Sequence, residues 1–321
     1  MQNNSGGTRN EQKPPTWPGQ CAAASDCKNM PCYNPVKAYA SEAGGVVFWG
    51  KAGHEEIQLA CGQCIGCRIE RSRQWAVRIM HEAQMHEENC FLTLTYDEKN
   101  LPENLSLRHR DIQLFLKRLR KKVGEIRYYM CGEYGGINGR PHYHMCLFGH
   151  GFYNDRYKWA KSNGHQLYRS ETLEKTWGLG NCTIGELTFE TAQYTAGYVV
   201  DKLFDKNDDK NITEIIDITT GEIVKRKSEY GRMSLNPAVG KNWLRAYWPE
   251  AKDGKIVING KEATAPKYYR DYFKNTKHHV QLMDNVMEGI KPEDNTWRRL
   301  KDRERFTTEQ KLRKRRHEIE N

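Results

Sequence analysis

The chain has 321 residues, with 51 Lys and Arg against 41 Asp and Glu and a net charge of +10. This length allows one large domain or two small ones, and the positive charge favours an anionic partner such as nucleic acid. No apolar run approaches the roughly 18 residues that span a bilayer, and the N-terminus lacks the apolar core of a signal peptide. We therefore expect a protein of a reducing cytoplasm with no membrane partner, whose ten cysteines are metal ligands or free thiols before disulfides.

The chain divides into four predicted parts. Residues 1–20 are rich in Asn, Gly, Gln and Pro and are expected to be disordered. Residues 21–67 carry six of the ten cysteines and predict a small, irregular, stapled segment. Residues 68–275 contain the predicted helices and strands of the main domain, and residues 276–321 form a charged tail that is expected to be partly helical.

The main domain opens on a helix, predicted over 68–88 from apolar residues near a 3.6-residue period. An alternating strand follows over 90–97. A second helix is predicted over 106–124, with basic residues in its last turn, where the helix dipole favours them. Its apolar face consists of Ile112, Phe115, Leu116 and Leu119.

Two further strands, 126–135 and 141–149, flank a Gly-rich turn and predict a hairpin. A short helix over 170–178 has Ser170 as its candidate N-cap. The remaining predicted elements are a strand over 182–187, a helix over 188–206 and a loop or hairpin insertion over 205–228. This order predicts an α+β domain with a central antiparallel sheet and helices on one side.

A pair of histidines, His142 and His144, lies in the second hairpin strand. Side chains two residues apart in a strand share a face, and Glu133 on the preceding strand can lie across from them. Two imidazoles and a carboxylate with open positions suit a divalent cation. The mixed set favours Mn²⁺ or Mg²⁺, although it would equally suit catalytic zinc. The alternative is a pair of histidines on a solvated strand face without a function.

A pair of tyrosines, Tyr194 and Tyr198, lies four residues apart on the predicted helix over 188–206, so both phenols share a face. An aromatic stripe packed on the sheet is the alternative interpretation. Lys202, one turn further on, would add a positive charge on that side. A phenol of pKa about 10 is a poor nucleophile at neutral pH, and a nearby cation together with a metal-polarised phosphate would correct this.

The cysteines fall into two groups. Cys61, Cys64 and Cys67 have CxxCxxC spacing, and a fourth ligand for one zinc can come from the upstream cluster that includes Cys27 and Cys32. Structural zinc is favoured, with free thiols, an iron–sulfur site and a redox pair as alternatives. The other four cysteines fall in predicted strands and are expected in the core: Cys90, Cys131, Cys146 and Cys182.

Several residues are candidates for contacts with DNA. Arg140, directly before the histidine strand, is the preferred phosphate contact because of its position. The basic run over 117–122 is interpreted as a solvated helix face. Trp243, Tyr247 and Trp248 are expected to pack rather than to stack on bases. The basic tail would add nonspecific affinity that falls with salt.

Taken together, these motifs resemble those of the HUH endonucleases, which nick single-stranded DNA and keep its 5′ end as a phosphotyrosine. The segments "CGQCIGC", "FLTLTYD", "GRPHYHMCLFG", "QYTAGYV" and "MSLNPAVGKNW" are further similar, in order, to the replication initiators of gokushovirus-type microviruses. The resemblance covers residues 58–275. It implies an HUH-type domain of RRM or ferredoxin-like fold and a role in starting rolling-circle replication.

The resemblance also implies roles for individual residues. His142 and His144 would bind the metal ion, and Glu133 takes the place of an upstream carboxylate ligand. Tyr194 and Tyr198 match the paired nucleophiles of two-tyrosine initiators. The family has two lysines after the second tyrosine, whereas this chain has Asp201 followed by Lys202, so Lys202 is left to balance the phosphate charge.

The implied partners are single-stranded DNA carrying a replication origin and, because the sequence contains no helicase P-loop, the helicase and polymerase of the host. The implied location is the cytoplasm of the host bacterium. Two alternatives remain open. One is a relaxase or single-strand transposase with the same chemistry, and the other is a noncatalytic, zinc-stapled protein that binds single-stranded DNA.

Overall fold

A computed structural model describes residues 32–40, 46–49, 56–135, 139–162, 164–203, 212–216, 221–251, 253–258, 260–273 and 296–320. The disorder predicted for residues 1–20 and the predicted ligand Cys27 lie outside these ranges. Within them, no helix is both long and apolar enough to cross a membrane.

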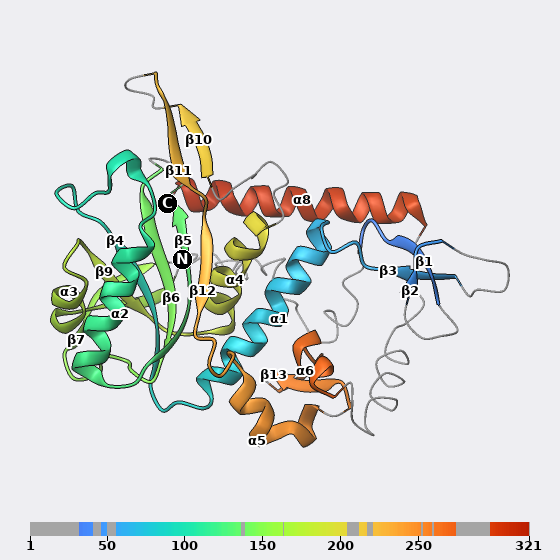
Figure 1. Cartoon of the computed structure of the whole chain (residues 1–321), viewed down its shortest axis with the longest axis horizontal. Coiled ribbons are helices and arrows are strands. Elements are labelled where there is room, and N and C mark those ends of the chain that lie inside the picture. Colours follow the sequence, from blue (N-terminus) through green and yellow to red (C-terminus); the bar gives the residue numbers. More distant parts are fainter. Residues whose placement is uncertain are drawn as a thin grey trace, which may run out of the picture.

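The centre of the molecule is an antiparallel sheet of seven strands (Figure 1). The strands are β4 (Asn89–Thr95), β5 (Arg127–Tyr134), β6 (Pro141–Phe148), β7 (Arg156–Ser162), β8 (His165–Ser170), β9 (Cys182–Gly185) and β12 (Tyr230–Met233). Their spatial order is β12-β5-β6-β4-β9-β8-β7, so β4 and β5 flank β6 in the middle of the sheet. The predicted α+β class, antiparallel sheet and β5–β6 hairpin are confirmed.

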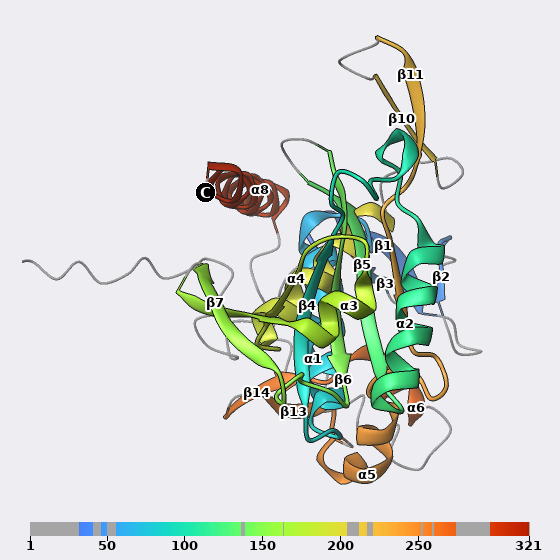
Figure 2. The ribbon, with the colours of Figure 1, turned by 90° about the vertical axis from the view of Figure 1, so that its left-hand side faces the viewer.

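Helices cover both faces of this sheet, which Figure 2 shows closer to edge-on. On one face α2 (His109–Val123) and α3 (Glu171–Trp177) pack on Tyr143 and Met145 of β6. On the other face α1 (Ile65–Ala83) and α4 (Phe189–Leu203) pack on Cys146 and Phe148 of the same strand. The prediction of helices on one side is therefore wrong. Successive residues of β6 point to opposite faces, and both sets are apolar, so both faces require cover.

Local signals set most element boundaries. The four apolar residues predicted for α2 are all buried, and the hydroxyl of Ser170 accepts a hydrogen bond from the backbone N–H of Leu173 at 3.1 Å, as predicted for the cap of α3. The first helix, predicted over 68–88, instead runs over Ile65–Ala83. It ends early because the Asn89 side chain donates to the carbonyl of Ala83 at 2.9 Å and so satisfies an exposed helix terminus.

Several elements lie outside the central sheet. The cysteine-rich segment is less irregular than predicted, since β1 (Val36–Ala40), β2 (Val46–Val47) and β3 (Glu56–Leu59) form a small antiparallel sheet. The predicted insertion is confirmed as a hairpin of β10 (Ile212–Ile216) and β11 (Ile223–Lys227). The charged tail forms a long helix, α8 (Trp297–Glu320).

The segment after β12 packs against α1 and was not predicted in detail. It consists of α5 (Lys241–Ala251), the hairpin of β13 (Lys255–Ile258) and β14 (Lys261–Thr264), and α6 (Lys267–Tyr272). Trp243, Leu244 and Tyr269 form a separate core there with Val77 of α1. Trp243 is buried, so the interpretation that it packs is confirmed.

Candidate metal and tyrosine site

Three side chains converge near the end of the β5–β6 hairpin. The strand register places Glu133 directly opposite His142, and His144 lies two residues further along the same face. One ligand atom from each residue lies within 4.8 Å of the other two. Oε1 of Glu133 lies 2.7 Å from Nε2 of His142 and 2.8 Å from Nε2 of His144. The predicted convergence of the carboxylate and the histidine pair is therefore present in the structure.

The second nitrogen of each imidazole is also engaged. Nδ1 of His142 lies 3.2 Å from the carbonyl oxygen of Arg140, and Nδ1 of His144 lies 3.0 Å from the hydroxyl of Thr93 on β4. These contacts hold both rings with Nε2 directed at the carboxylate. Such outer partners orient metal-binding histidines and raise their basicity.

The carboxylate of Glu133 is 1% exposed and fully charged. Burial raises its pKa, but hydrogen bonds from His142 and His144 outweigh burial and lower the pKa to about 2. Burial likewise opposes the charge of His142, whereas the Glu133 carboxylate raises the pKa of this imidazole overall. Oε2 of Glu133 is buried and has no hydrogen-bond partner among the described residues. Such an acceptor suits a cation that the histidines and the carboxylate would share.

Tyr194 brings a phenol to this group. Its hydroxyl donates to Oε1 of Glu133 at 3.3 Å, and its ring meets that of His144 edge to face, with centroids 5.2 Å apart. The helix that carries it, α4, begins where the Thr188 hydroxyl accepts from the backbone N–H of Thr191 at 3.3 Å. The structure thus brings the first predicted nucleophile to the predicted metal ligands.

Helix α4 is held close to α1 because its contact residues are small. Ala192 and Ala196 are fully buried against α1 and the sheet, and the hydroxyl of Ser72 donates to the carbonyl of Gln193 at 2.8 Å. Tyr198 and Lys202 lie one and two turns beyond Tyr194 on the same helix. Their side chains lie outside the described residues, so their predicted roles stay predictions.

Arg140 lies at the entrance to β6, beside the site. Its guanidinium donates to the carboxylate of Glu98 and, at 3.1 Å, to the carbonyl of Tyr96. A phosphate would have to replace the carboxylate of Glu98, whose side chain is 79% exposed. The role of Arg140 in phosphate binding stays a prediction.

Two residues of β4 belong to the site and were not singled out from the sequence. Thr93 lies opposite His144 in the β4–β6 register and bonds its imidazole, while Phe91 stacks on the same ring with centroids 5.4 Å apart. The signal was the alternation of the strand, which sets Phe91 and Thr93 on one face. Only the pairing of β4 with β6 shows that this is the histidine face.

The matched region of known relatives coincides with this site. Residues 89–203 match the family model of the ORF2-type replication-associated proteins, a range that runs from β4 to the end of α4. The chain is also 32% identical over 266 residues to replication-associated protein VP4 of Bdellovibrio phage phiMH2K, an alignment that covers 78% of this chain and 79% of that protein.

The chain belongs to the microvirus replication-associated proteins.

Other members are similar over shorter ranges. ORF2 of Spiroplasma virus 4 is 37% identical over 156 residues, which cover 45% of this chain and 48% of that protein. ORF4 of Chlamydia phage 1 is 30% identical over 235 residues, which cover 67% of this chain and 53% of that protein. No solved structure matches the chain. The family resemblance inferred from the motifs is confirmed, and it supports a role of this microvirus protein in phage DNA replication.

A second cluster in this replication-associated protein consists of thiols. The sulfurs of Cys32, Cys61, Cys64 and Cys67 lie within 4.8 Å of one another, so Cys32 is the upstream residue that joins the CxxCxxC motif. The other cysteine prediction is confirmed. All four strand cysteines are buried: Cys90, Cys131, Cys146 and Cys182.

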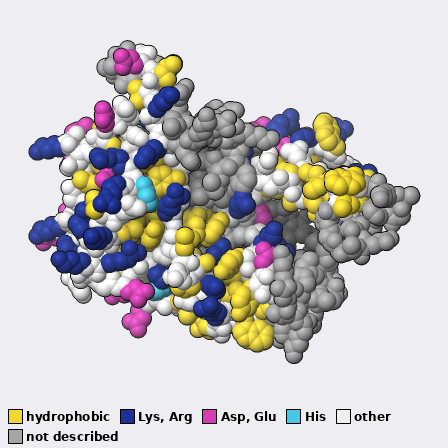
Figure 3. All heavy atoms as spheres, viewed as in Figure 1, with side chains coloured by type: hydrophobic (Ala, Val, Ile, Leu, Met, Phe, Trp, Pro, Cys, Tyr) yellow, Lys and Arg dark blue, Asp and Glu magenta, His cyan; other side chains and the backbone are white. Residues whose placement is uncertain are grey.

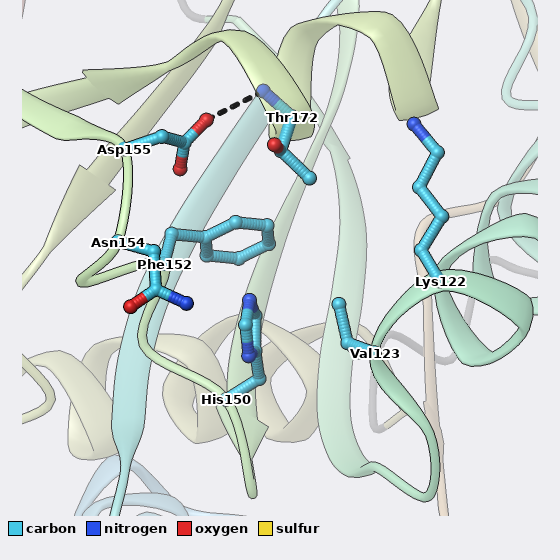
Figure 4. A pocket seen from close by; sticks show the side chains of 7 residues that line it. All are labelled: Lys122, Val123, His150, Phe152, Asn154, Asp155 and Thr172. Carbon is cyan, nitrogen blue, oxygen red and sulfur yellow. Dashed lines mark hydrogen bonds between the residues drawn. The ribbon is translucent and has the colours of Figure 1, made fainter.

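Two further features of the protein lie on the opposite face of the sheet. Figure 4 shows a hollow of about 340 Å³ between the end of α2 and the start of α3. Its carboxylate, Asp155, accepts from the backbone N–H of Thr172 at 2.7 Å and from the hydroxyl of Ser170, so it supports the start of α3. Lys and Arg side chains gather over α2 (Figure 3). The exposed residues of this basic run are consistent with a solvated face: Lys117, Arg120, Lys121 and Lys122.

Proposed function

We propose that this protein nicks and rejoins single-stranded DNA at the phage replication origin through a 5′-phosphotyrosine, with an HUH-type domain. One observation supports the proposal above all others. The Tyr194 hydroxyl lies 3.3 Å from the same carboxylate oxygen that both histidines contact. A nucleophile and a cation-binding group thus lie within reach of one phosphate, which is the arrangement that tyrosine-mediated strand transfer requires.

The chemistry balances as a transesterification. The Tyr194 oxygen bonds to the scissile phosphorus, and the bond from that phosphorus to the 3′ oxygen breaks. The phenolic proton is lost, and the leaving 3′ oxygen takes up a proton to become a hydroxyl. Because the tyrosyl ester replaces one phosphodiester bond with another, a free 3′-hydroxyl can attack it, release the tyrosine and close a circle.

His142, His144 and Glu133 are the residues that would hold Mg²⁺ or Mn²⁺. A bound cation would neutralise charge on the transferring phosphate and orient it for attack in line. A carboxylate of pKa about 2 is a weak base, so the role of Glu133 is that of a ligand that also positions the Tyr194 hydroxyl. The hydroxyl of Thr93 and the carbonyl of Arg140 keep both imidazoles aimed at that position.

Tyr198 and Lys202 complete the proposed machinery on α4. A second tyrosine one helical turn away would accept a second strand while the first product is still attached, which suits one nick that begins a round of replication and another that ends it. Lys202 would balance phosphate charge beside Tyr198. Both assignments rest on the helical spacing and on the family resemblance.

The proposal is tested with end-labelled single strands that tile the cognate phage genome, incubated with protein and Mn²⁺ or Mg²⁺. A denaturing gel then reports label that is covalently bound to protein. We expect an adduct that requires the cation and is lost in the double variant Tyr194→Phe with Tyr198→Phe. Tyr157→Phe, on the exposed edge strand β7, is the matched control and should leave the adduct intact.

The single variants divide the work between the tyrosines. Loss of the adduct in Tyr194→Phe alone would name Tyr194 as the principal nucleophile. Tight DNA binding without any adduct, with the origin present, would overturn the proposal in favour of a noncatalytic DNA-binding protein. Cleavage at a transfer origin or at the end of a mobile element would indicate a relaxase or transposase with the same chemistry.

A further inference from the structure

Four thiols meet where three distant segments of the chain come together. Cys32 precedes β1, Cys61 and Cys64 precede α1, and Cys67 lies in the first turn of that helix. All four are free cysteines. Neither the nicking site nor the phosphate contacts proposed above use them.

The spacing of the sulfurs fits one tetrahedral ion. With zinc–sulfur distances of about 2.3 Å, the sulfurs of a tetrahedral site lie about 3.8 Å apart. The Cys64 and Cys32 sulfurs are 3.8 Å apart, and all four lie within 4.8 Å of one another. A disulfide requires about 2.05 Å. An iron–sulfur cluster divides its cysteines among two or more irons, which sets sulfurs on different irons further apart than those around one ion.

The backbone also prepares these sulfurs to carry negative charge. The N–H of Tyr33 donates to the Cys64 sulfur at 3.3 Å, and the N–H of Cys61 donates to the Cys32 sulfur at 3.1 Å. The sulfur of Cys61 accepts from the N–H groups of Gln63 and Cys64 at 3.4 and 3.3 Å. Donors directed at sulfur stabilise thiolates, the form that binds metal.

We propose that these four cysteines bind one Zn²⁺ as a closed structural site, and that this site docks the C-terminal helix α8 onto the body of the protein. With four protein ligands the ion has no open position for water or substrate, which is typical of structural zinc. The proposal does not depend on the nicking activity.

The docking of α8 depends on residues that the thiol cluster holds in place. Leu300 is the one buried side chain among those described in α8, and it packs on Tyr33 and Cys64. Polar contacts continue this seam. The Tyr33 hydroxyl lies 3.0 Å from that of Thr307, and Lys301 donates to the side-chain oxygen of Asn34 at 2.6 Å.

Figure 1 shows α8 running from the small sheet of β1 to β3 past the start of α1. This helix is strongly charged, with ten Lys and Arg and five Asp and Glu over residues 297–320, so it has little apolar surface to hold it elsewhere. Because Tyr33 and Asn34 directly follow Cys32, release of Cys32 from the metal would free the segment on which α8 rests.

Metal analysis of the full-length protein tests the site. We expect one zinc per chain, absent from Cys61→Ser and Cys64→Ser. Zinc should be retained by Cys182→Ser, a buried thiol outside the cluster, and by the double variant His142→Ala with His144→Ala, which removes the other candidate metal site. Replacement of zinc with Co²⁺ in the wild-type protein should give intense sulfur-to-metal charge-transfer absorption, and Cys67→His should keep the metal with a weaker band.

Three results would overturn the site. They are iron in place of zinc, a mass two hydrogens lower per pair of cysteines because of a disulfide, and four thiols that alkylate freely in native protein without bound metal. Zinc that is lost with the two histidines rather than with the cysteines would also overturn it, by assigning that ion to the other site.

Trypsin digestion tests the docking. We expect α8 to be protected in zinc-loaded protein and cleaved within residues 298–316 after a mercurial reagent releases the metal, while fragments of the central sheet stay intact. Leu300→Ala should expose α8 to trypsin yet retain zinc, which separates docking from metal binding. Equal protection of α8 before and after zinc release would show that the site does not dock the helix.

Discussion

Glu133 lies at the centre of the electrostatics of the site. A buried carboxylate is costly unless its charge is compensated, and here two imidazoles compensate one of its oxygens while the other has no partner among the described residues. The residue therefore links three roles: it pairs with the histidines, accepts from Tyr194 and offers an oxygen to a cation. Removal of its charge should affect cation binding first.

Glu133→Gln should abolish the response of thermal stability to Mn²⁺. In the wild-type protein, Mn²⁺ at a hundred times its Kd should add about 2.7 kcal/mol to the free energy of unfolding. The measurement is thermal unfolding of zinc-loaded protein with and without Mn²⁺. Glu98→Gln, which removes an exposed carboxylate beside the site, is the control and should respond as the wild type does. A full Mn²⁺ response in Glu133→Gln would contradict the assignment of this ligand.

His81 shows the opposite use of a histidine. It is 1% exposed, stacks on Trp243 with ring centroids 3.5 Å apart, and its Nδ1 lies 3.0 Å from the Tyr269 hydroxyl. Burial lowers its pKa from 6.5 to about 3. This imidazole is a neutral core group that joins α1 to α5 and α6.

The stability that His81 contributes should be lost in acid. The unfolded chain binds a proton below pH 6.5, whereas folded His81 resists protonation down to a pH of about 3. The contribution is therefore complete above pH 6.5 and falls by about 1.4 kcal/mol per pH unit below it. Urea unfolding at pH 7.5 and 5 should show a decline about 2 kcal/mol smaller in His81→Gln than in the wild type. The exposed His165 provides the control variant His165→Gln, and an unchanged decline in His81→Gln would refute the account.

At the scale of elements, a buried ion pair attaches the segment between β12 and α5 to the body of the protein. Arg127 of β5 donates to Glu82 of α1 at 2.5 Å and to the carbonyls of Asn236 and Pro237. The other oxygen of Glu82 accepts from the N–H of Gly240 at 2.6 Å. The pair thus satisfies backbone groups of a segment that makes no sheet or helix of its own.

Glu82→Gln should destabilise the protein strongly, because it leaves the buried Arg127 without its counter-charge. The expected loss is about 3–5 kcal/mol in the free energy of unfolding, measured in urea. Glu174→Gln, which breaks the more exposed pair with Arg169, should cost less than about 1 kcal/mol. Similar costs for the two variants would show that the Glu82 pair is not the attachment we infer.

At the scale of the whole molecule, positive charge is distributed over both sides of the sheet. The exposed basic residues of α2 lie on the face opposite the candidate site, whereas α8 ends in a basic run, residues 313–316. If binding of single-stranded DNA involves the phosphate backbone, these two groups of equal charge should differ in their effect.

Replacement of Arg313, Lys314, Arg315 and Arg316 with Gln should weaken the salt dependence of binding to single-stranded DNA. Each phosphate neutralised on a single strand contributes about 0.7 to the slope of log affinity against log salt, so the slope should fall by up to about 3. The matched control replaces the same number of charges on α2, at Lys117, Arg120, Lys121 and Lys122, and should keep the slope. Binding is measured by fluorescence anisotropy over a salt series, and a larger effect from the α2 set would place the DNA on the other face.

Some elements escaped prediction because their sequence carries no pattern that local physics can interpret. The β7–β8 hairpin is such a case. Strand β7 is exposed along nearly its whole length, so lysines and aromatics alternate without an apolar face, and no burial period marks the strand. The central strands were predicted well because one or both of their faces are buried and therefore apolar.

The amino-acid sequence was sufficient for everything that depends on near neighbours along the chain. The shared face of His142 and His144 follows from the period of a strand, the cap at Ser170 from a local hydrogen bond, and the CxxCxxC spacing from three adjacent turns. Only the tertiary structure decided which distant groups meet: Thr93 at His144, Cys32 at Cys64, and Tyr194 at Glu133. Strand order and helix docking set these contacts, and both depend on the burial of apolar surface over the whole chain, which no short segment encodes.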